Sequence, residues 1–184
     1  MFAVTMFNSD PPPVVDQGVI VATSLFHEFY RDSAALVLTP RCDIAQEKAE
    51  FLTLCAVVGP EQVAAGAGWR TLGRLRDELG KIMGGQIYRW HWLDPFGPFQ
   101  NGAVVDFELV VSVALSTLND ATGIAELAST WREQIATRYA AYAGRIGVPS
   151  IPKAEFVARR NEVAQHVLDA LPPLPAPDAP TAIN

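Results

Sequence analysis

The chain has 184 residues, of which 14 are basic and 20 acidic, and it carries a formal net charge of −6. Hydrophobic residues make up 49% and charged residues 18%, a globular composition that excludes a disordered chain, a coiled coil and a collagen-like repeat. The length predicts one domain over residues 1–184 that needs no metal or disulfide to fold. The acidic balance argues against non-specific nucleic-acid binding, although it is compatible with a local basic groove.

The cysteines, histidines and apolar runs limit the cofactors and the compartment. Cys42 and Cys55 are too few for a disulfide framework and lack the spacing of a metal knuckle. Three histidines without an HExxH motif predict no metal site, and the missing GxGxxG and P-loop motifs predict no nucleotide cofactor. No secretory leader is recognised, and no apolar run reaches the roughly 18 residues of a membrane span. We therefore expect a cytoplasmic protein without cofactors and without a membrane partner.

Short apolar strands dominate the first part of the chain. We expect strands over residues 18–22, 34–39, 51–58, 86–93 and 103–112, the last one bent near Asp106. A helix is predicted over residues 69–81, because Leu72, Leu75 and Leu79 recur at helical spacing.

Helical signals dominate the last third. Thr130 and Glu133 form a capping box that opens a helix running to about residue 146. Its buried stripe is predicted to comprise Trp131, Ile135, Tyr139, Tyr142 and Ile146. A second helix is expected over residues 153–171, with Phe156, Val163 and Val167 facing inward, before a mobile Pro/Ala-rich tail.

Strands followed by helices indicate an α+β protein. Strands this short, joined by tight loops, suit a small antiparallel β-barrel whose closure removes exposed edges. We expect the barrel within residues 14–116, with one inserted helix, a C-terminal helical pair within 117–171 and the tail over 172–184.

Three segments resemble the opening of MazF/PemK-type toxins. They are Gly-Val-Ile-Val at 18–21, Ala-Leu-Val-Leu-Thr-Pro at 35–40 and Val-Val-Gly-Pro at 57–60, within a resemblance that covers about residues 16–60. The resemblance implies an SH3-like barrel and an endoribonuclease that pairs with an antitoxin. It places Glu28 and Arg31 in the loop that holds active-site residues of the family. Asp32 follows Arg31 where the family has proline, and Gly59-Pro60 stands where the family has Thr or Ser.

A cysteine flanked by opposite charges follows the second predicted strand. Arg41 would stabilise a Cys42 thiolate beside Asp43, and His27 or His91 would act as its base. The alternative is a packing cysteine beside an Arg–Asp pair that orders a turn.

The predicted strand 86–93 offers a second candidate site. Its alternation places Arg89 and His91 on one face and Tyr88, Trp90 and Trp92 on the other, a pattern that could hold a phosphate and stack a base. The alternative is a strand with an aromatic core face and a solvated Arg–His face.

Two acids in the strand 103–112 also form a pattern. Asp106 and Glu108 lie two residues apart on one face of that strand. They are either paired carboxylates or solvent-facing acids on a half-buried strand.

Two functions fit these patterns. The first is a toxin-like barrel of a bacterial toxin or defence system that binds or cleaves RNA, with Glu28, Arg31 and Arg41 near one rim and Arg89 and His91 across it. The second is a non-catalytic module that presents an Arg- and aromatic-rich face to a protein partner, such as an antitoxin or a neighbouring subunit. The first requires the arginine-bearing connections to meet at a common mouth.

Overall fold

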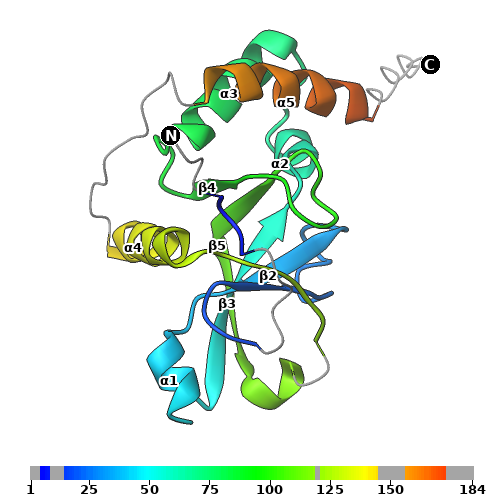
Figure 1. The fold of residues 1–184 in the computed structure, drawn as a ribbon. Helices are drawn as coiled ribbons and strands as arrows, with labels where there is room; N and C mark the ends of the chain where they lie inside the picture. Colours follow the sequence, from blue (N-terminus) through cyan, green and yellow to red (C-terminus); the bar gives the residue numbers. More distant parts are fainter. Residues whose placement is uncertain (1–4, 9–14, 119–120, 145–155, 173–184) are drawn as a thin grey trace, which may run out of the picture.

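A computed structural model describes residues 5–8, 15–118, 121–144 and 156–172. Its centre is one antiparallel sheet with the strand order β4-β5-β3-β2-β1-β6 (Figure 1). The strands are β1 (Val19–Ala22), β2 (Ser33–Val37), β3 (Phe51–Val58), β4 (Trp90–Leu93), β5 (Ala103–Ala114) and β6 (Gly123–Glu126). The helices are α1 (Arg41–Ala45), α2 (Pro60–Gly66), α3 (Leu72–Met83), α4 (Ser129–Gly144) and α5 (Val157–Ala170), with a 3-10 turn η1 (Leu115–Leu118).

The sheet curls into a half-barrel. The segment after β4 crosses the hollow side toward β6, where an added Cβ at Gly97 would lie 2.5 Å from Ile124. The ring of Phe96 packs on that of Phe7, with 4.6 Å between the ring centroids. These contacts enclose an inner apolar cluster between the two edge strands.

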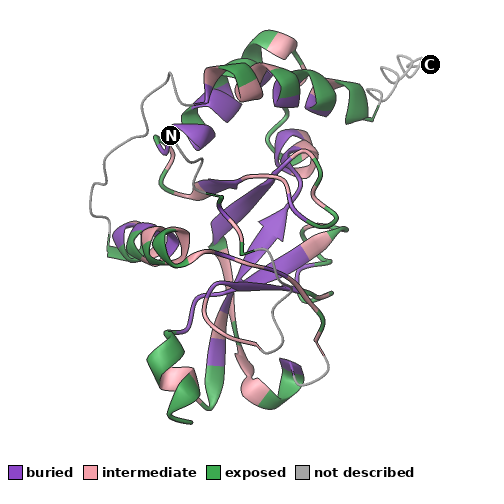
Figure 2. Cartoon of the chain, in the orientation of Figure 1, coloured by how far each residue is buried: buried purple, intermediate pink, exposed green. Residues whose placement is uncertain are grey.

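Alternation along β3 builds two cores from one strand. Leu54 and Val58 face an outer cluster that α3 and α5 cover, whereas Cys55 and Val57 face the inner cluster. Ile135 of α4 is buried in that inner cluster. The purple central strands in Figure 2 show that both faces of the sheet are covered.

The five predicted strands and the predicted helix are present, although β4 covers only residues 90–93 of the predicted strand 86–93. The short elements α1, α2, η1 and β6 were not predicted. Pro60 begins α2, where a proline at the first turn loses no hydrogen bond. The four residues of β6 lie in the segment expected to be helical. They form a strand because β1 pairs with them, and so short a segment has no strand pattern of its own.

The two expected C-terminal helices are present as α4 and α5. α5 packs on α3 and α2, whereas α4 lies against the inner cluster, so the two helices cover different faces (Figure 1). The inward residues were largely correct: Ile135, Phe156, Val163 and Val167 are buried, and Trp131, Tyr139 and Tyr142 pack against the inner cluster. Residue 146 and residues 173–184 of the tail lie outside the described residues.

The helices of the described segments are too short or too polar for a bilayer, so none of them is a candidate membrane span.

Candidate functional site

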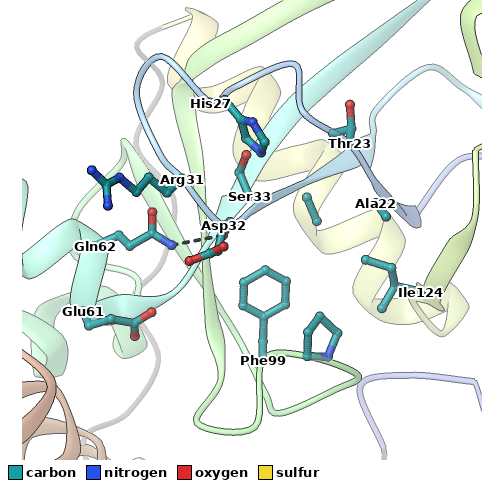
Figure 3. Close-up of a pocket in the computed structure, with 12 residues that line it drawn as sticks. Ala22, Thr23, His27, Arg31, Asp32, Ser33, Glu61, Gln62, Phe99 and Ile124 are labelled. Atoms are coloured by element: carbon teal, nitrogen blue, oxygen red, sulfur yellow. Dashed lines mark hydrogen bonds between the residues drawn. The ribbon is translucent and has the colours of Figure 1, made fainter.

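An open cleft of about 560 Å³ lies between the loop joining β1 to β2, the start of α2 and the loop after β4 (Figure 3). These three connections lie close together because the antiparallel sheet brings them to the same end of its strands. The cleft is lined by Ala22, Thr23, His27, Arg31, Asp32, Ser33, Ala34, Glu61, Gln62, Pro98, Phe99 and Ile124.

One wall of the cleft is polar. Gln62 donates from Nε2 to the carbonyl oxygen of Asp32 at 3.0 Å and so ties α2 to the β1–β2 loop. Glu61 folds back over Gly59, where an added Cβ atom would overlap the Glu61 carboxylate. Glycine at this helix N-cap therefore leaves room for the carboxylate. The polar wall combines the carboxylates of Asp32 and Glu61 with the Arg31 cation.

The opposite wall is apolar. Phe99 and Ile124 face the polar residues across the cleft (Figure 3). The Phe99 ring is held by Phe96, with 5.2 Å between centroids, and remains only partly buried. A positioned, accessible ring of this kind can stack on a planar ligand group.

Two proton-carrying groups lie on the upper side of the cleft as drawn in Figure 3. His27 is exposed, and Ser33 points to the His27 side of the cleft. The Ser33 Oγ is buried and has no hydrogen-bond partner within the described part of the chain. A buried hydroxyl without a partner costs free energy.

The structure places only part of the predicted active-site loop in the cleft. Arg31 lines the cleft, and His27, considered as a base, lies beside it. Glu28 belongs to the same loop and is exposed, but it is not among the lining residues.

The Arg41, Cys42 and Asp43 group lies at the other end of β2, in α1, so the expectation that Arg41 shares a rim with Arg31 is wrong. The length of β2 separates Arg31 from Arg41, because the connections before and after a strand emerge at its opposite ends. Arg41 forms ion pairs with Asp16 and Glu126. Cys42 is exposed, and its Sγ donates to Asp43 Oδ1 at 3.5 Å.

The expected solvated face of Arg89 and His91 is also wrong. Only 3% of His91 is exposed, and its ring stacks near Phe107 in the inner cluster. Burial, followed by the charge of Arg138, lowers the pKa of His91 to about 3. Arg89 precedes β4 and binds Asp106, so neither side chain lines the cleft. Their role in substrate binding stays a prediction.

Asp106 is the centre of a buried polar network that the sequence did not reveal. It is fully buried and accepts two hydrogen bonds from Arg89, at 2.8 and 2.7 Å. The Tyr30 hydroxyl donates to it at 3.1 Å, and burial together with the negative Asp106 raises the pKa of Tyr30 to about 12. Tyr30 thereby ties the loop of His27 and Arg31 to β5. The available signal was a carboxylate inside the most apolar run of the chain, which requires a buried partner.

The expectation of two solvent-facing acids on β5 is wrong for Asp106, which is fully buried. Glu108 is more than half exposed and forms an ion pair with the same Arg89. The two carboxylates therefore share a cation.

The described segments contain no cluster of three His, Cys, Asp or Glu side chains that could hold a metal ion.

Comparisons with protein-family models, with curated proteins and with solved structures gave no match. Fold and site together define an α+β half-barrel with an open cleft that carries a cation, carboxylates, an imidazole and an accessible aromatic ring.

Proposed function

We propose that this chain is a MazF/PemK-like protein of a bacterial toxin or defence system, with an SH3-like barrel, that binds and cleaves single-stranded RNA in the cleft of Figure 3. The arginine-bearing connections do not meet at a common mouth as expected, because Arg41 lies at the other end of β2. The proposal is carried instead by the meeting of His27, Arg31 and Glu61 around one open cavity. These are the three kinds of group that transesterification of RNA needs: a base, an acid and a cation.

The chemistry needs no co-reactant. Glu61 accepts the proton of the 2′-hydroxyl, whose oxygen then attacks the adjacent phosphorus. The bond from phosphorus to the 5′-oxygen breaks, and protonated His27 gives its proton to that leaving oxygen. Arg31 stabilises the additional negative charge on the phosphoryl oxygens in the transition state. The products are a 2′,3′-cyclic phosphate and a 5′-hydroxyl.

The remaining cleft residues suit the binding of a nucleotide. The Phe99 ring stacks on the base, an interaction that tolerates any base and therefore favours unpaired RNA. Gly59-Pro60 stands where the family resemblance expects Thr or Ser, and Glu61 follows directly after it. In this proposal the Glu61 carboxylate takes the role of that hydroxyl.

The test uses a single-stranded RNA oligonucleotide labelled at both ends, with the DNA oligonucleotide of the same sequence as the comparison. We expect products with cyclic phosphate ends from RNA only. Arg31→Gln and Glu61→Gln each lower the cleavage rate at least 100-fold, since each removes a group that acts in the transition state. Thermal melting of every variant confirms that it is folded.

Arg41→Gln is the matched control, because Arg41 lies at the other end of β2 from the cleft. It should leave the cleavage rate within twofold of the parent protein. An RNA that is neither bound nor cut, or a rate that Arg41→Gln lowers as much as Arg31→Gln, contradicts the proposal.

A second candidate function is a protein-binding module, and one observation favours it. Phe29 and Leu25 of the β1–β2 loop are 63% and 39% exposed, an unusual solvent exposure for two large apolar side chains in one loop. Under this function, a chain encoded by a neighbouring gene binds the loop, and Phe29→Ser weakens that binding at least tenfold. RNA cleavage by the purified protein alone separates the two functions.

A further inference from the structure

A second, smaller cavity of about 130 Å³ is lined by β4 residues and by none of the cleft residues. The N-terminal segment, the end of α3, β4, α4 and α5 all contribute to its walls. Figure 1 shows β4 between α4 on one side and the α3–α5 pair on the other. Because a water molecule takes up about 30 Å³ in the liquid, the cavity holds about four waters or a ligand of that size.

Three nitrogen atoms of the cavity residues are buried without hydrogen-bond partners in the described segments. They are His91 Nε2, Trp131 Nε1 and Arg159 Nε. The indole and guanidinium nitrogens can only donate a hydrogen bond, so both require an acceptor. Buried donors without acceptors are rare in folded proteins and indicate a missing partner.

His91 supplies the third polar group of this wall. It is buried to 97%, and burial keeps its imidazole neutral by lowering its pKa to about 3. A neutral imidazole donates or accepts at Nε2 according to its tautomer. His91 therefore adapts to the ligand, whereas Trp131 and Arg159 dictate that the ligand carries acceptors.

The cavity is lined by one cation, Arg159, and one carboxylate, Asp94, which form an ion pair, so the need for an acceptor comes from the unpartnered donors and not from net charge. Arg159 Nε lies 3.6 Å from Asp94 Oδ1, beyond hydrogen-bond range, and its guanidinium lies 6.0 Å from the Trp92 ring. Asp94 is engaged by Trp92, whose Nε1 donates to Oδ1 at 3.3 Å. The Arg159 donors are therefore only partly used by the protein. The rest of the wall is apolar and includes Phe156.

We propose that this cavity binds a small aliphatic carboxylate, of about the size of propionate. Its carboxylate oxygens accept hydrogen bonds from Trp131 Nε1 and Arg159, and its short hydrocarbon chain packs against Trp92 and Phe156. The site is separate from the RNA cleft, since the two cavities share no lining residue.

The experiment follows the indole N–H signals of the ¹⁵N-labelled full chain by NMR while sodium propionate is added at constant ionic strength. Trp131→Phe assigns the Trp131 signal among those of the four tryptophans. We expect a saturable shift of that signal with a dissociation constant in the millimolar range. Propanol and propylammonium chloride, which match propionate in size but lack the carboxylate, should give no saturable shift.

Arg159→Gln should raise the dissociation constant at least tenfold. Arg160→Gln is the matched control on the same helix, because Arg160 hydrogen bonds to Asn161 and does not line the cavity. If Arg159→Gln fails to fold, as judged by its indole spectrum, Arg159→Lys retains the charge and should keep binding within tenfold. A linear shift, an equal shift with propanol or unchanged affinity in folded Arg159→Gln would show that the cavity holds only water.

Discussion

Burial sets the chemistry of individual residues in this protein more than residue type does. His27 and His91 are both imidazoles, yet His27 is exposed in an open cleft whereas His91 is buried beside the Phe107 ring. Cys42 and Cys55 differ in the same way, since Cys42 is exposed and Cys55 is buried. These contrasts make two measurable predictions.

His91 should make the protein less stable in mild acid. Its pKa is about 3 in the folded protein and 6.5 ordinarily, so between these values the unfolded chain binds a proton that the folded chain does not. The His91 contribution to the free energy of unfolding is complete above pH 6.5. It falls by about 1.4 kcal/mol per pH unit below that, or about 2 kcal/mol at pH 5.

Urea unfolding at pH 7 and pH 5 measures this loss. His91→Gln should lower the loss by that amount, whereas His166→Gln, at an exposed position, should leave it unchanged. Equal pH dependence in the parent and His91→Gln proteins would contradict a neutral, buried His91.

The two thiols should differ in reactivity. Burial raises the pKa of Cys55 well above its usual range, and its Sγ donates to the Asp106 carbonyl at 3.0 Å. Because the thiolate is the reactive form, iodoacetamide should label Cys42 in the folded protein and Cys55 only after unfolding. Mass spectrometry of the labelled peptides measures both. Early labelling of Cys55 would show that this part of the sheet opens.

At the scale of elements, the β5 bulge connects the core to the cleft. The pairing of β3 with β5 passes from Cys55–Val110 to Ala56–Asp106, so residues 107–109 of β5 are left without partners on β3. Such a bulge redirects side chains. Here Asp106 at its edge binds Arg89, which precedes β4, and Tyr30, which belongs to the cleft loop.

Arg89→Met should lower the free energy of unfolding by about 3 kcal/mol, because it leaves the Asp106 carboxylate buried without its cation. This figure is at the low end for a buried pair, since the Arg89 side chain is 38% exposed. Arg76→Met, at an exposed position of α3, is the matched control and should change stability by less than about 0.5 kcal/mol. Urea denaturation measures both. A cost for Arg89→Met no larger than that of the control would contradict the importance of the network.

At the scale of the whole molecule, the two cores share their strands. Each of β2, β3 and β5 contributes alternate side chains to the outer and the inner cluster. Neither cluster can therefore lose its packing without disturbing the strands that build the other. The described segments should unfold as one cooperative unit.

Leu79→Ala in the outer cluster and Ile135→Ala in the inner cluster test this cooperativity. Each substitution should lower the free energy of unfolding by about 2–5 kcal/mol. For each variant, tryptophan fluorescence and far-UV circular dichroism should report one common urea midpoint, lower than that of the parent protein. Leu25→Ala, at a 39% exposed position, is the matched control and should move the midpoint little. Separate transitions for the two probes would show that the helical layer and the half-barrel unfold independently.

Local patterns in the chain were sufficient to predict the first five strands, α3 and the inward faces of α4 and α5. Each depends on the periodicity of neighbouring residues, which a strand or helix expresses wherever it packs. The placement of Arg31 in a candidate site came from the family resemblance and not from a local pattern. β6 could not be predicted in this way, because its pairing with β1 is a contact between residues about 100 positions apart.

Tertiary structure alone decided which charged groups meet. It buried His91, paired Arg89 with Asp106, separated Arg41 from Arg31 and brought Glu61 and Phe99 to the same cleft. The sequence determined which side chains could carry charge, and the curl of the sheet determined which of them water reaches. The physical reason is that solvation and electrostatic partners are properties of position in space, and positions distant along the chain become neighbours only when the sheet and its helices pack.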